Sequence, residues 1–402
     1  MPDTEEIINL TQKYLIPTYN RQAVVFERGQ GCRLWDTEGR KYLDFVSGLG
    51  VNSLGYGYPS VVKAIQEQAE KLLHVSNLFT ISQQARLAQM IVRQAFSGKM
   101  FFCNSGAEAN EAAIKLARIY ARKERGIEQG EIITAYRSFH GRTMATLTAT
   151  GQEKVQKGFE PLLSGFRHVP FNDLAAVREA ANDATIAVMI EPIQGEGGVH
   201  VGTIEYLAGL RDFCTRQGIL LILDEVQTGI GRTGRFFCHQ HADLEPDIVS
   251  MAKALGSGVP IGAILARDEV ARAFVPGSHA TTFGGNPLSC AAGIATVSAI
   301  VEDGILENCQ KAGNHLSEGI KGLQRKYPFI KEVRGKGLLW GMELDRDGSR
   351  IVRTCLEKGL IINCTMGNVL RFLPPLVISR EEIDEGLAVL DAVLSQADNV
   401  SQ

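Results

Sequence analysis

Lys253 stands out as a residue that could do chemistry. It is a primary amine inside the apolar stretch SMAKALGSGVP (250–260), with no acid beside it. A lysine buried without a partner is costly, so this one either reaches solvent from a loop or takes part in a reaction. Burial lowers the pKa of a lysine and increases the fraction of free amine, the nucleophile of Schiff-base chemistry. We therefore treat Lys253 as a candidate nucleophile.

A candidate carboxylate follows a strongly apolar run. ILLILDEV (219–226) contains Asp224 at the predicted end of a strand. In open parallel sheets, ligands bind at the carboxyl ends of the strands. Asp224 would then lie where a ligand binds, although an acid that only caps the next turn fits the pattern equally well.

An anion site is predicted at the start of NSGAEANEAAIKLAR (104–118). Ser105 and Gly106 bring a hydroxyl and free backbone N–H groups to the positive end of a predicted helix, which favours phosphate. Ser105 and Glu108 also match the capping-box pattern Ser-x-x-Glu, and both interpretations can hold together.

Three charged residues occur in glycine-, proline- or aromatic-rich segments. Arg142 lies in FHGRT, Glu196 in EPIQGEGG and Arg371 in NVLRFLPP. Either arginine could hold a carboxylate with its guanidinium fork. The glycines around Glu196 indicate a loop. Taken singly, each residue fits an ordinary surface charge better.

Two further patterns predict no site of their own. GIGRTG (229–234) matches the dinucleotide pattern G-x-G-x-x-G of nicotinamide-dependent oxidoreductases. That pattern opens a helix, yet RFFCHQHADLEPD follows without a helical period, so we expect these glycines to shape a loop. Cys238, His239 and His241 could share a strand face, but no fourth ligand stands at a suitable spacing, and we predict no metal.

The composition excludes several classes of protein. The chain has 402 residues, 45% of them hydrophobic, which is enough for two domains. Its net charge of −3 and lack of basic runs argue against nucleic-acid or anionic-membrane partners. The N-terminus does not resemble a signal peptide, and no apolar run approaches about 20 residues. Eight cysteines without a CxxC pair predict reduced, mostly buried thiols and a cytoplasmic location.

Short apolar runs alternate with helical patterns through the middle of the chain. Helix candidates at 107–124 and 203–218 separate buried-strand candidates, which predicts a mostly parallel sheet covered by helices. The strand candidates are MFFCNS (100–105), EIITAY (131–136), AVMIEP (187–192), ILLILDEV (219–226), DIVSMAK (247–253) and IGAILAR (261–267).

The two ends of the chain have a different character. A helical stretch at 287–326 precedes two segments typical of an antiparallel sheet, 332–344 and 360–378, and a final helix at 380–397. GCRLWDTEGRKYLDF (31–45) predicts a hairpin with its turn at Glu38-Gly39. We predict an α/β fold: a large mostly parallel-sheet domain and a smaller α+β lobe from both chain ends. The predicted segments are 1–58, 59–300 and 301–402.

Taken together and in this order, the motifs resemble the class III aminotransferases of the fold-type I pyridoxal-phosphate enzymes. The resemblance covers nearly the whole chain and is strongest to the acetylornithine aminotransferases. If the chain were a non-enzymatic interaction protein, the presence of all these motifs would be a coincidence. The motifs are NSGAEAN, FHGR, EPIQGEGG, LDEVQTGIGRTG, MAKALGSG and TTFGGNP.

The resemblance implies roles around pyridoxal 5'-phosphate. Lys253 would form the Schiff base with the cofactor and later move a proton. Asp224 would face the pyridine nitrogen and keep it protonated, so that the ring accepts electrons. Gln227 would bind the phenolic oxygen, and Phe139 and Val226 would lie against opposite faces of the ring.

The resemblance also implies a homodimer. Ser105, Gly106 and Ala107 would hold the phosphate, and Thr282 of the second subunit would complete that site. Thr281 would join the substrate-binding residues. A ligand site shared between subunits would make the dimer obligatory.

Substrate roles fall to three charged residues by the same resemblance. Arg142 would bind the carboxylate of the amino donor. Glu196 would cover Arg371 while the donor reacts and move away when 2-oxoglutarate enters. An internal partner makes sense because an unpaired buried arginine is costly.

The donor implied is N²-acetylornithine, as in arginine biosynthesis. Leu49 stands where ornithine aminotransferases carry a tyrosine that helps to bind free ornithine, and an apolar residue there fits an acylated, uncharged α-amino group. Succinylornithine, succinyl-diaminopimelate, ornithine and 4-aminobutyrate stay open as alternative donors.

Overall fold

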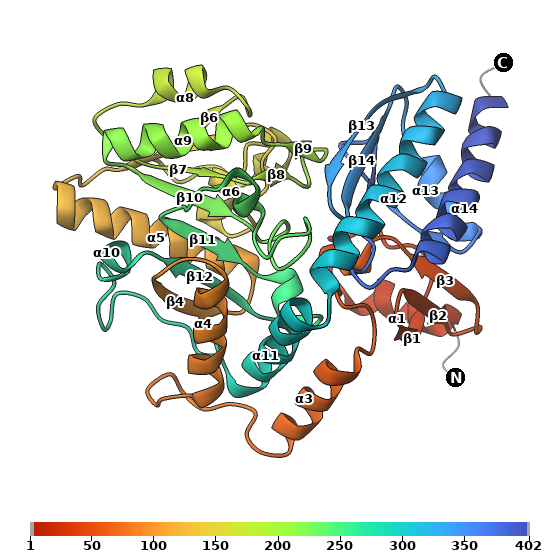
Figure 1. Ribbon diagram of the computed structural model, residues 1–402, viewed down its shortest axis with the longest axis horizontal. Helices are drawn as coiled ribbons and strands as arrows, with labels where there is room; N and C mark the ends of the chain where they lie inside the picture. Colours follow the sequence, from red (N-terminus) through yellow and green to blue (C-terminus); the bar gives the residue numbers. More distant parts are fainter. Residues whose placement is uncertain (1–3, 400–402) are drawn as a thin grey trace.

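The centre of the fold is a seven-stranded sheet (Figure 1). The computed structural model describes residues 4–399 of the chain. The sheet has the strand order β4-β12-β11-β10-β7-β5-β6. The strands are β4 (Lys99–Cys103), β5 (Glu131–Ala135), β6 (Phe166–Val169), β7 (Thr185–Ile190), β10 (Leu220–Asp224), β11 (Ile248–Met251) and β12 (Gly262–Ala266).

Most of these strands are parallel, as predicted. β11, β10, β7, β5 and β6 pair in parallel, whereas β12 is antiparallel to both of its neighbours, β11 and β4. Every residue of β7 and β10 is buried, which explains their uninterrupted apolar sequences. The reversal of β12 left no trace in its sequence, because a strand buried on both faces reads the same in either direction.

Helices cover both faces of the sheet. α5 (Gly106–Arg125) shares a buried cluster with Ile222, and α9 (Ile204–Gln217) shares another with Leu221 and Leu223. Successive residues of a strand point to opposite faces, so these helices lie on opposite sides. The other helices and small strands of this part are α3 (Pro59–Ala69), α4 (Ser82–Gln94), α6 (Met144–Ala149), α7 (Glu153–Gln156), α8 (Leu174–Ala180), α10 (Asp268–Ala271), β8 (Ile193–Gln194) and β9 (His200–Val201).

The predicted helical stretch 287–326 consists of two helices, α11 (Pro287–Glu302) and α12 (Ile305–Lys326), bent by 67° at the break. Gly304 lies at this break with φ +72°, a conformation that favours glycine. None of the helices described is by itself long and apolar enough to cross a membrane; α11 and α12 meet that test only when taken together across their bend.

Both ends of the chain meet in the remaining part (Figure 1). β13, β14, β17 and β16 form the predicted antiparallel sheet, and the predicted hairpin joins β2 to β3. β3 then pairs in parallel with β15, so residues near both termini share a sheet. The elements are α1 (Thr4–Tyr14), β1 (Phe26–Gln30), β2 (Arg33–Asp36), β3 (Lys41–Asp44), α2 (Ser47–Gly50), β13 (Ile330–Lys336), β14 (Leu339–Leu344), α13 (Ser349–Glu357), β15 (Leu360–Ile361), β16 (Asn363–Thr365), β17 (Val369–Phe372) and α14 (Arg380–Asn399).

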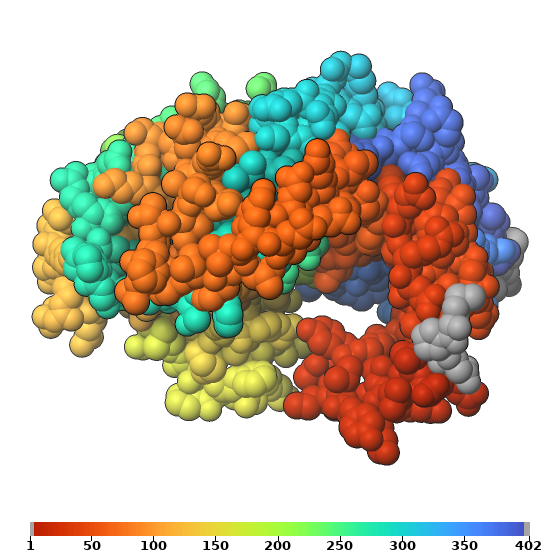
Figure 2. Space-filling view, turned by 90° about the horizontal axis from the view of Figure 1, so that it is seen from below, coloured from red at the N-terminus to blue at the C-terminus, as the bar shows by residue number. Residues whose placement is uncertain are grey.

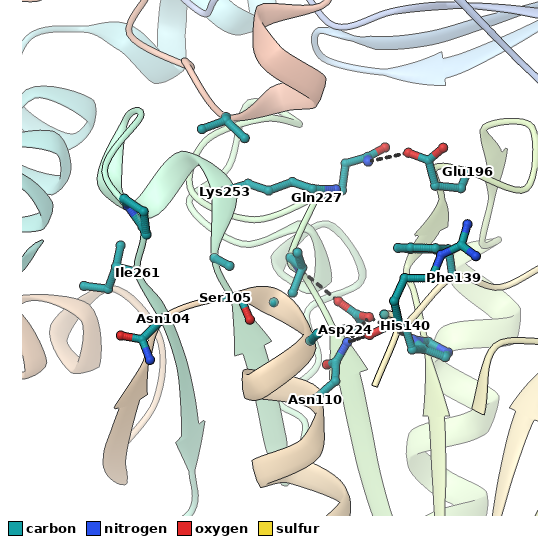
Figure 3. A pocket seen from close by; sticks show the side chains of 18 of the residues that line it. Asn104, Ser105, Asn110, Phe139, His140, Glu196, Asp224, Gln227, Lys253 and Ile261 are labelled. Carbon is teal, nitrogen blue, oxygen red and sulfur yellow. Dashed lines mark hydrogen bonds and ion pairs between the residues drawn. The ribbon is translucent and has the colours of Figure 1, made fainter. Parts of the chain in front are cut away.

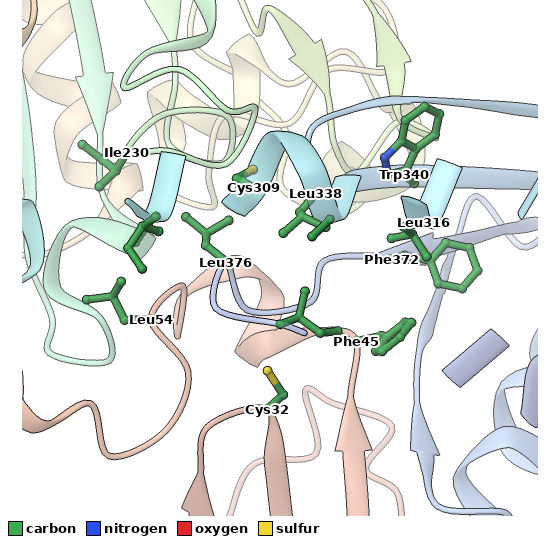
Figure 4. Close-up of a cluster of buried hydrophobic side chains, with 14 of the residues drawn as sticks. Cys32, Phe45, Leu54, Ile230, Cys309, Leu316, Leu338, Trp340, Phe372 and Leu376 are labelled. Carbon is green, nitrogen blue, oxygen red and sulfur yellow. The ribbon is translucent and has the colours of Figure 1, made fainter. Parts of the chain in front are cut away.

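One hydrophobic cluster joins these parts (Figure 4). It contains Phe45 from the N-terminal segment, Ile230 from the loop 229–234 and Phe372 from β17.

All eight cysteines are free thiols and seven are buried, as predicted. We propose the boundaries 1–58, 59–300 and 301–402 as domain limits, since the seven-stranded sheet lies entirely within the middle segment.

The glycine pattern GIGRTG forms a loop, as predicted. Residues 229–233 are in turns and Gly234 is in a bend, with φ +91° at Gly231 and +85° at Gly234, and the next helical element is the short 3-10 helix at 238–242. Cys238, His239 and His241 lie in a 3-10 helix, η1 (Cys238–Ala242), and not on a strand, so their alternation does not place them on a common strand face. Within residues 4–399, no group of three or more His, Cys, Asp or Glu side chains could hold a metal ion.

Candidate active site

Most of the predicted site residues line one cavity of about 440 Å³ (Figure 3). They come from the ends of β4, β10 and β11 and from loops of the sheet. From the predicted set, the cavity is lined by Ser105, Gly106, Ala107, Phe139, Arg142, Glu196, Asp224, Val226, Gln227 and Lys253.

The first helical turn of α5 forms one wall. The side chain of Ser105 accepts a hydrogen bond from the backbone N–H of Glu108 at 3.2 Å. The predicted capping box is only half correct, because the Glu108 carboxylate accepts from the N–H of Asn104 and not from that of Ser105. A Cβ at Gly106 would lie 2.6 Å from Cγ1 of Val226, so glycine is needed for this close approach. The helix N-terminus facing the cavity suits an anion.

Asp224 is held by three hydrogen bonds. Its Oδ2 accepts from Nδ2 of Asn110 at 2.7 Å and bonds Nδ1 of His140 at 2.8 Å, while Oδ1 accepts from the N–H of Val226 at 3.0 Å. The side chain of Asn110 is fixed in turn, because its Oδ1 accepts from the hydroxyl of Ser250 at 2.6 Å. We call Asp224, His140 and Asn110 the Asp224 network. All three residues are buried.

The sequence reasoning missed His140 and Asn110. Both stand inside motifs that were recognised, FHGR and NSGAEAN, but a single sequence does not show which distant residues meet. Burial would lower the pKa of His140, yet the hydrogen bond and charge of Asp224 raise it above its usual value. Nε2 of His140 is buried and has no hydrogen-bond partner within the described part of the chain.

Glu191, also missed, is a buried residue of the same cavity lining. Its carboxylate accepts hydrogen bonds from the N–H groups of Phe139 at 3.0 Å and Gly195 at 3.2 Å. Burial raises the pKa of Glu191 to about 7, although the neighbouring His140 opposes this. Glu191 thus holds the backbone of two chain segments, at Phe139 and at Gly195.

Glu196 and Arg371 form an ion pair. Their Oε1 and Nη1 atoms are 2.6 Å apart, and Gln227 bridges them with hydrogen bonds of 3.4 Å to Glu196 and 3.3 Å from Arg371. Nε of Arg371 donates to Oδ1 of Asn363 at 3.3 Å. Nη2 of Arg371 is buried and has no partner among the residues described. The guanidinium therefore keeps one unused donor.

The burial of the two charges is unequal. The side chain of Arg371 is 0% exposed and that of Glu196 is 30% exposed. Burial alone would raise the pKa of Glu196, but the charges of Arg371 and Lys253 outweigh it and lower the pKa. The glutamate is therefore the partner with room to move.

Lys253 enters the cavity just after β11, from a strained backbone position with φ +40°. Burial lowers its pKa, although the carboxylate of Glu196 opposes this. Apolar residues form the adjoining wall of the cavity, including Val51, Val259, Pro260 and Ile261.

Five predicted residues lie at the margin of the cavity or outside it. Arg371 is one of them, because it contacts the lining residues Glu196 and Gln227 without lining the cavity itself. Arg142 is exposed at its edge, with the guanidinium carbon 5.5 Å from the ring centroid of Phe139. Thr281 and Thr282 do not line the cavity of the single chain; Oγ1 of Thr281 is 3.3 Å from Nδ2 of Asn104, and Thr282 is exposed. Leu49 is 46% exposed and is also absent from the lining, unlike Val51.

These features fit pyridoxal phosphate. The cavity offers a buried amine at Lys253, a carboxylate at Asp224 and a helix N-terminus at Ser105 for a phosphate. The absence of a Cβ at Gly106 leaves Val226 in contact with the helix start. A single compact group with an aldehyde, a ring nitrogen and a phosphate could engage all three.

Comparison with known proteins identifies the family. Residues 16–394 match the family Aminotransferase class-III. The acetylornithine aminotransferase of Caldanaerobacter subterraneus is 55% identical over 391 residues, 97% of this chain and 99% of that protein. The acetylornithine aminotransferase of Methanocaldococcus jannaschii is 50% identical over 396 residues, 98% of both chains.

Solved structures agree with this. The ornithine aminotransferase of Toxoplasma gondii superimposes with a TM-score of 0.95 at 32% identity, covering 99% of this chain and 96% of that one. Another structure of that enzyme is described with partial occupancy of pyridoxal phosphate at the active site. The acetylornithine aminotransferase of Elizabethkingia anophelis gives a TM-score of 0.89 at 34% identity, covering 98% and 100%. The chain belongs to the class III aminotransferases, which are pyridoxal-phosphate-dependent transaminases of fold type I.

Proposed function

We propose that the protein transfers the terminal amino group of N²-acetylornithine to 2-oxoglutarate, giving N-acetylglutamate 5-semialdehyde and glutamate. The observation that carries this proposal is the buried Arg371 covered by the partly exposed carboxylate of Glu196. Such a pair can serve two unlike substrates at one site. The acetylornithine aminotransferases at 50–55% identity support the choice of donor.

Pyridoxal phosphate, when bound, supplies an aldehyde that condenses with amines and a ring that accepts electrons from the carbon bearing the amine. Ser105, Gly106 and Ala107 would hold its phosphate at the start of α5. The Asp224 network would keep the ring nitrogen protonated, and Gln227 would bind the phenolic oxygen. Phe139 would lie against the ring.

Lys253 is the proposed nucleophile and proton carrier. Its lowered pKa favours the neutral amine, so Nζ can take a proton from the carbon that carries the amino group of the donor. The apolar wall beside it would limit the access of water to the amine of Lys253 and to the bound substrate. Arg142, at the edge of the cavity, would bind the α-carboxylate of the donor.

Glu196 and Arg371 would select between the substrates. While the donor reacts, Glu196 neutralises Arg371. When 2-oxoglutarate enters, Glu196 moves away. The α-carboxylate of 2-oxoglutarate then binds the guanidinium of Arg371, including the unused Nη2. A bidentate pair then replaces a single ion pair, which compensates for the displaced carboxylate.

We propose a homodimer in the cytoplasm. Thr282, exposed here, would complete the phosphate site of the second subunit. The segment that carries Thr282 lies beside the chain around residue 77, because Asn77 donates hydrogen bonds to the carbonyl oxygens of Thr281 and Gly284. Both segments carry exposed apolar side chains. Figure 2 shows the chain around residues 60–100 (orange) spread over one face of the molecule. The exposed apolar side chains of these two segments are Leu72, Leu73, Leu78, Phe79 and Phe283.

The test follows the absorbance of the cofactor in the loaded enzyme when one donor is added without acceptor. The donors are N²-acetylornithine, N²-succinylornithine, ornithine and 4-aminobutyrate. We expect acetylornithine to convert the cofactor fastest and free ornithine more slowly. A faster reaction with ornithine or 4-aminobutyrate would overturn the proposed donor, and absence of cofactor absorbance would overturn the whole proposal.

A further inference from the structure

A second arginine, Arg334 in β13, holds the turn that carries Glu196. Its Nε and Nη2 atoms both donate to the carbonyl oxygen of Gly198, at 2.9 and 2.6 Å. Nη1 pairs with the carboxylates of Glu332 at 2.7 Å and Glu343 at 2.6 Å. The side chain of Arg334 is only 9% exposed. All three guanidinium nitrogens are thus engaged, two of them on one backbone carbonyl.

Arg334 and Arg371 occupy one row across the C-terminal sheet. In the register of β13, β14 and β17, Arg334 lies opposite Gly341, and Gly341 lies opposite Arg371. Directly opposite residues in antiparallel strands project from the same face. A Cβ on Gly341 would be 2.9 Å from Cβ of Val199, so the missing side chain makes room for the chain that follows the turn. Two arginines of one row therefore bind the turn: Arg334 binds the backbone carbonyl of Gly198, and Arg371 binds the carboxylate of Glu196.

The turn has little freedom of its own. A Cβ on Gly195 would lie 1.9 Å from Oε1 of Gln227, and one on Gly197 would lie 2.2 Å from the carbonyl oxygen of Arg137. Glu191 accepts from the N–H of Gly195 at the start of the turn, and Arg334 binds the carbonyl of Gly198 at its end. With both ends held, Glu196 can leave Arg371 by rotating its side chain and can return to the same place.

From this we infer that Arg334 is a positioning residue for substrate selection: by fixing the carbonyl of Gly198, it sets how completely Glu196 covers Arg371. The inference rests on the proposed switch between donor and acceptor. A charge-assisted hydrogen bond depends steeply on distance and direction, so a shift of the turn by about 1 Å would weaken the cover. A less covered Arg371 would bind any dicarboxylate more readily, including a wrong donor.

The experiment compares the loaded wild-type enzyme with Arg334→Gln, Glu196→Ala, the double variant and the control Lys331→Gln. Lys331 lies on the same strand, is exposed and loses the same charge. The first readout is the ratio of kcat/KM for acetylornithine over glutamate in the half-reaction without acceptor. The second is the Kd for glutarate, an unreactive dicarboxylate, measured by calorimetry. A merely structural loss would not tighten that binding.

We expect Arg334→Gln to lower both the selectivity ratio and the Kd for glutarate by about fivefold. In the double variant, where Glu196 is already alanine, adding Arg334→Gln should change neither quantity. Lys331→Gln should match the wild type. A wild-type ratio and Kd in Arg334→Gln would overturn the inference, as would an equal effect in the Glu196→Ala background. If Arg334→Gln does not fold, Arg334→Lys enters the same cycle. Glutarate binding needs no turnover, so a failed donor assignment would be recognised separately.

Discussion

The two charged centres of the cavity are built in different ways. Asp224 lies at the end of a central strand and receives three hydrogen bonds, and its partner Asn110 is itself held by Ser250. Arg371 lies in β17 of the C-terminal sheet. Its one ion pair is to a partly exposed glutamate, its hydrogen bonds to Gln227 and Asn363 are both 3.3 Å long, and one of its nitrogens has no partner among the described residues.

This difference matches what each centre has to do. A group that acts on the cofactor is needed in the same position for both substrates, and a buried network holds one arrangement. A group that has to accept either an internal carboxylate or a substrate carboxylate needs a partner that can leave. Changes in the Asp224 network should therefore slow both half-reactions to a similar extent. Changes at Arg371 should slow the acceptor half-reaction much more than the donor half-reaction.

The largest effect is expected for Asp224→Asn. This change keeps the shape of the side chain and removes its charge, so the ring nitrogen loses its anionic partner. We expect kcat to fall by about 10³-fold in both the donor and the acceptor half-reaction. Stopped-flow absorbance of the loaded enzyme measures each half-reaction separately. A loss confined to one of them would contradict the shared role of the network.

Arg371→Ala should separate the half-reactions. The acceptor loses its buried guanidinium, and loss of a buried hydrogen-bonded charge partner costs about 2–5 kcal/mol. We expect kcat/KM for 2-oxoglutarate to fall by about 10²-fold or more, while the reaction with acetylornithine changes by less than about tenfold. Arg353→Ala, a change on the exposed side of α13, provides the control. Equal losses for both substrates would argue against a dedicated acceptor site.

Glu196→Ala should have a smaller and more selective effect. Without the internal carboxylate, Arg371 is free at all times, so the acceptor half-reaction should stay within about threefold of the wild type. Discrimination among donors should weaken by about tenfold, because glutamate can then compete for the free guanidinium. Steady-state kinetics with paired donors gives this ratio. Unchanged donor selectivity would count against the switch.

The smallest effect on activity is expected for His140→Asn, which keeps a donor near Asp224 without a titrating charge. The folded-state pKa of His140 is raised, so its stabilisation is fully present below its ordinary pKa of 6.5 and is lost as pH rises through the raised value. We expect the difference in unfolding free energy from wild type, about 1–3 kcal/mol, to be largest below pH 6.5 and to shrink above it. Urea unfolding of the two proteins across this pH range measures the difference. A pH-independent difference would show that the charge of His140 is not involved.

Local patterns allowed much of the fold to be predicted. The six strand candidates of the central sheet are strands, although each prediction ran one or two residues past an end. Helices α5 and α9 lie where their periodicity placed them. The long stretch 287–326 was predicted without its break at Gly304, because a bend that a single glycine permits leaves the helical pattern on either side unchanged.

The sequence by itself determined the chemical groups and the local structure that presents them. Local sequence effects, namely periodicity, capping and the cost of burying charge, are enough to predict three of these groups. They are an amine in an apolar stretch, an acid at the end of a buried strand and a serine at a helix start. The order of the motifs along the chain then indicated the family.

Only the tertiary structure decided which groups meet. Asn110 and His140 reach Asp224 across 114 and 84 residues of chain. Glu196 reaches Arg371 across 175 residues, a pairing that the family resemblance implied but that no local pattern of residues indicates. Arg334 joins the same turn from a different strand, through a row of the sheet that no local pattern describes. These contacts depend on the path of the backbone through the whole fold, and hydrogen bonds that depend on ångström distances cannot be read from residue types and spacing alone.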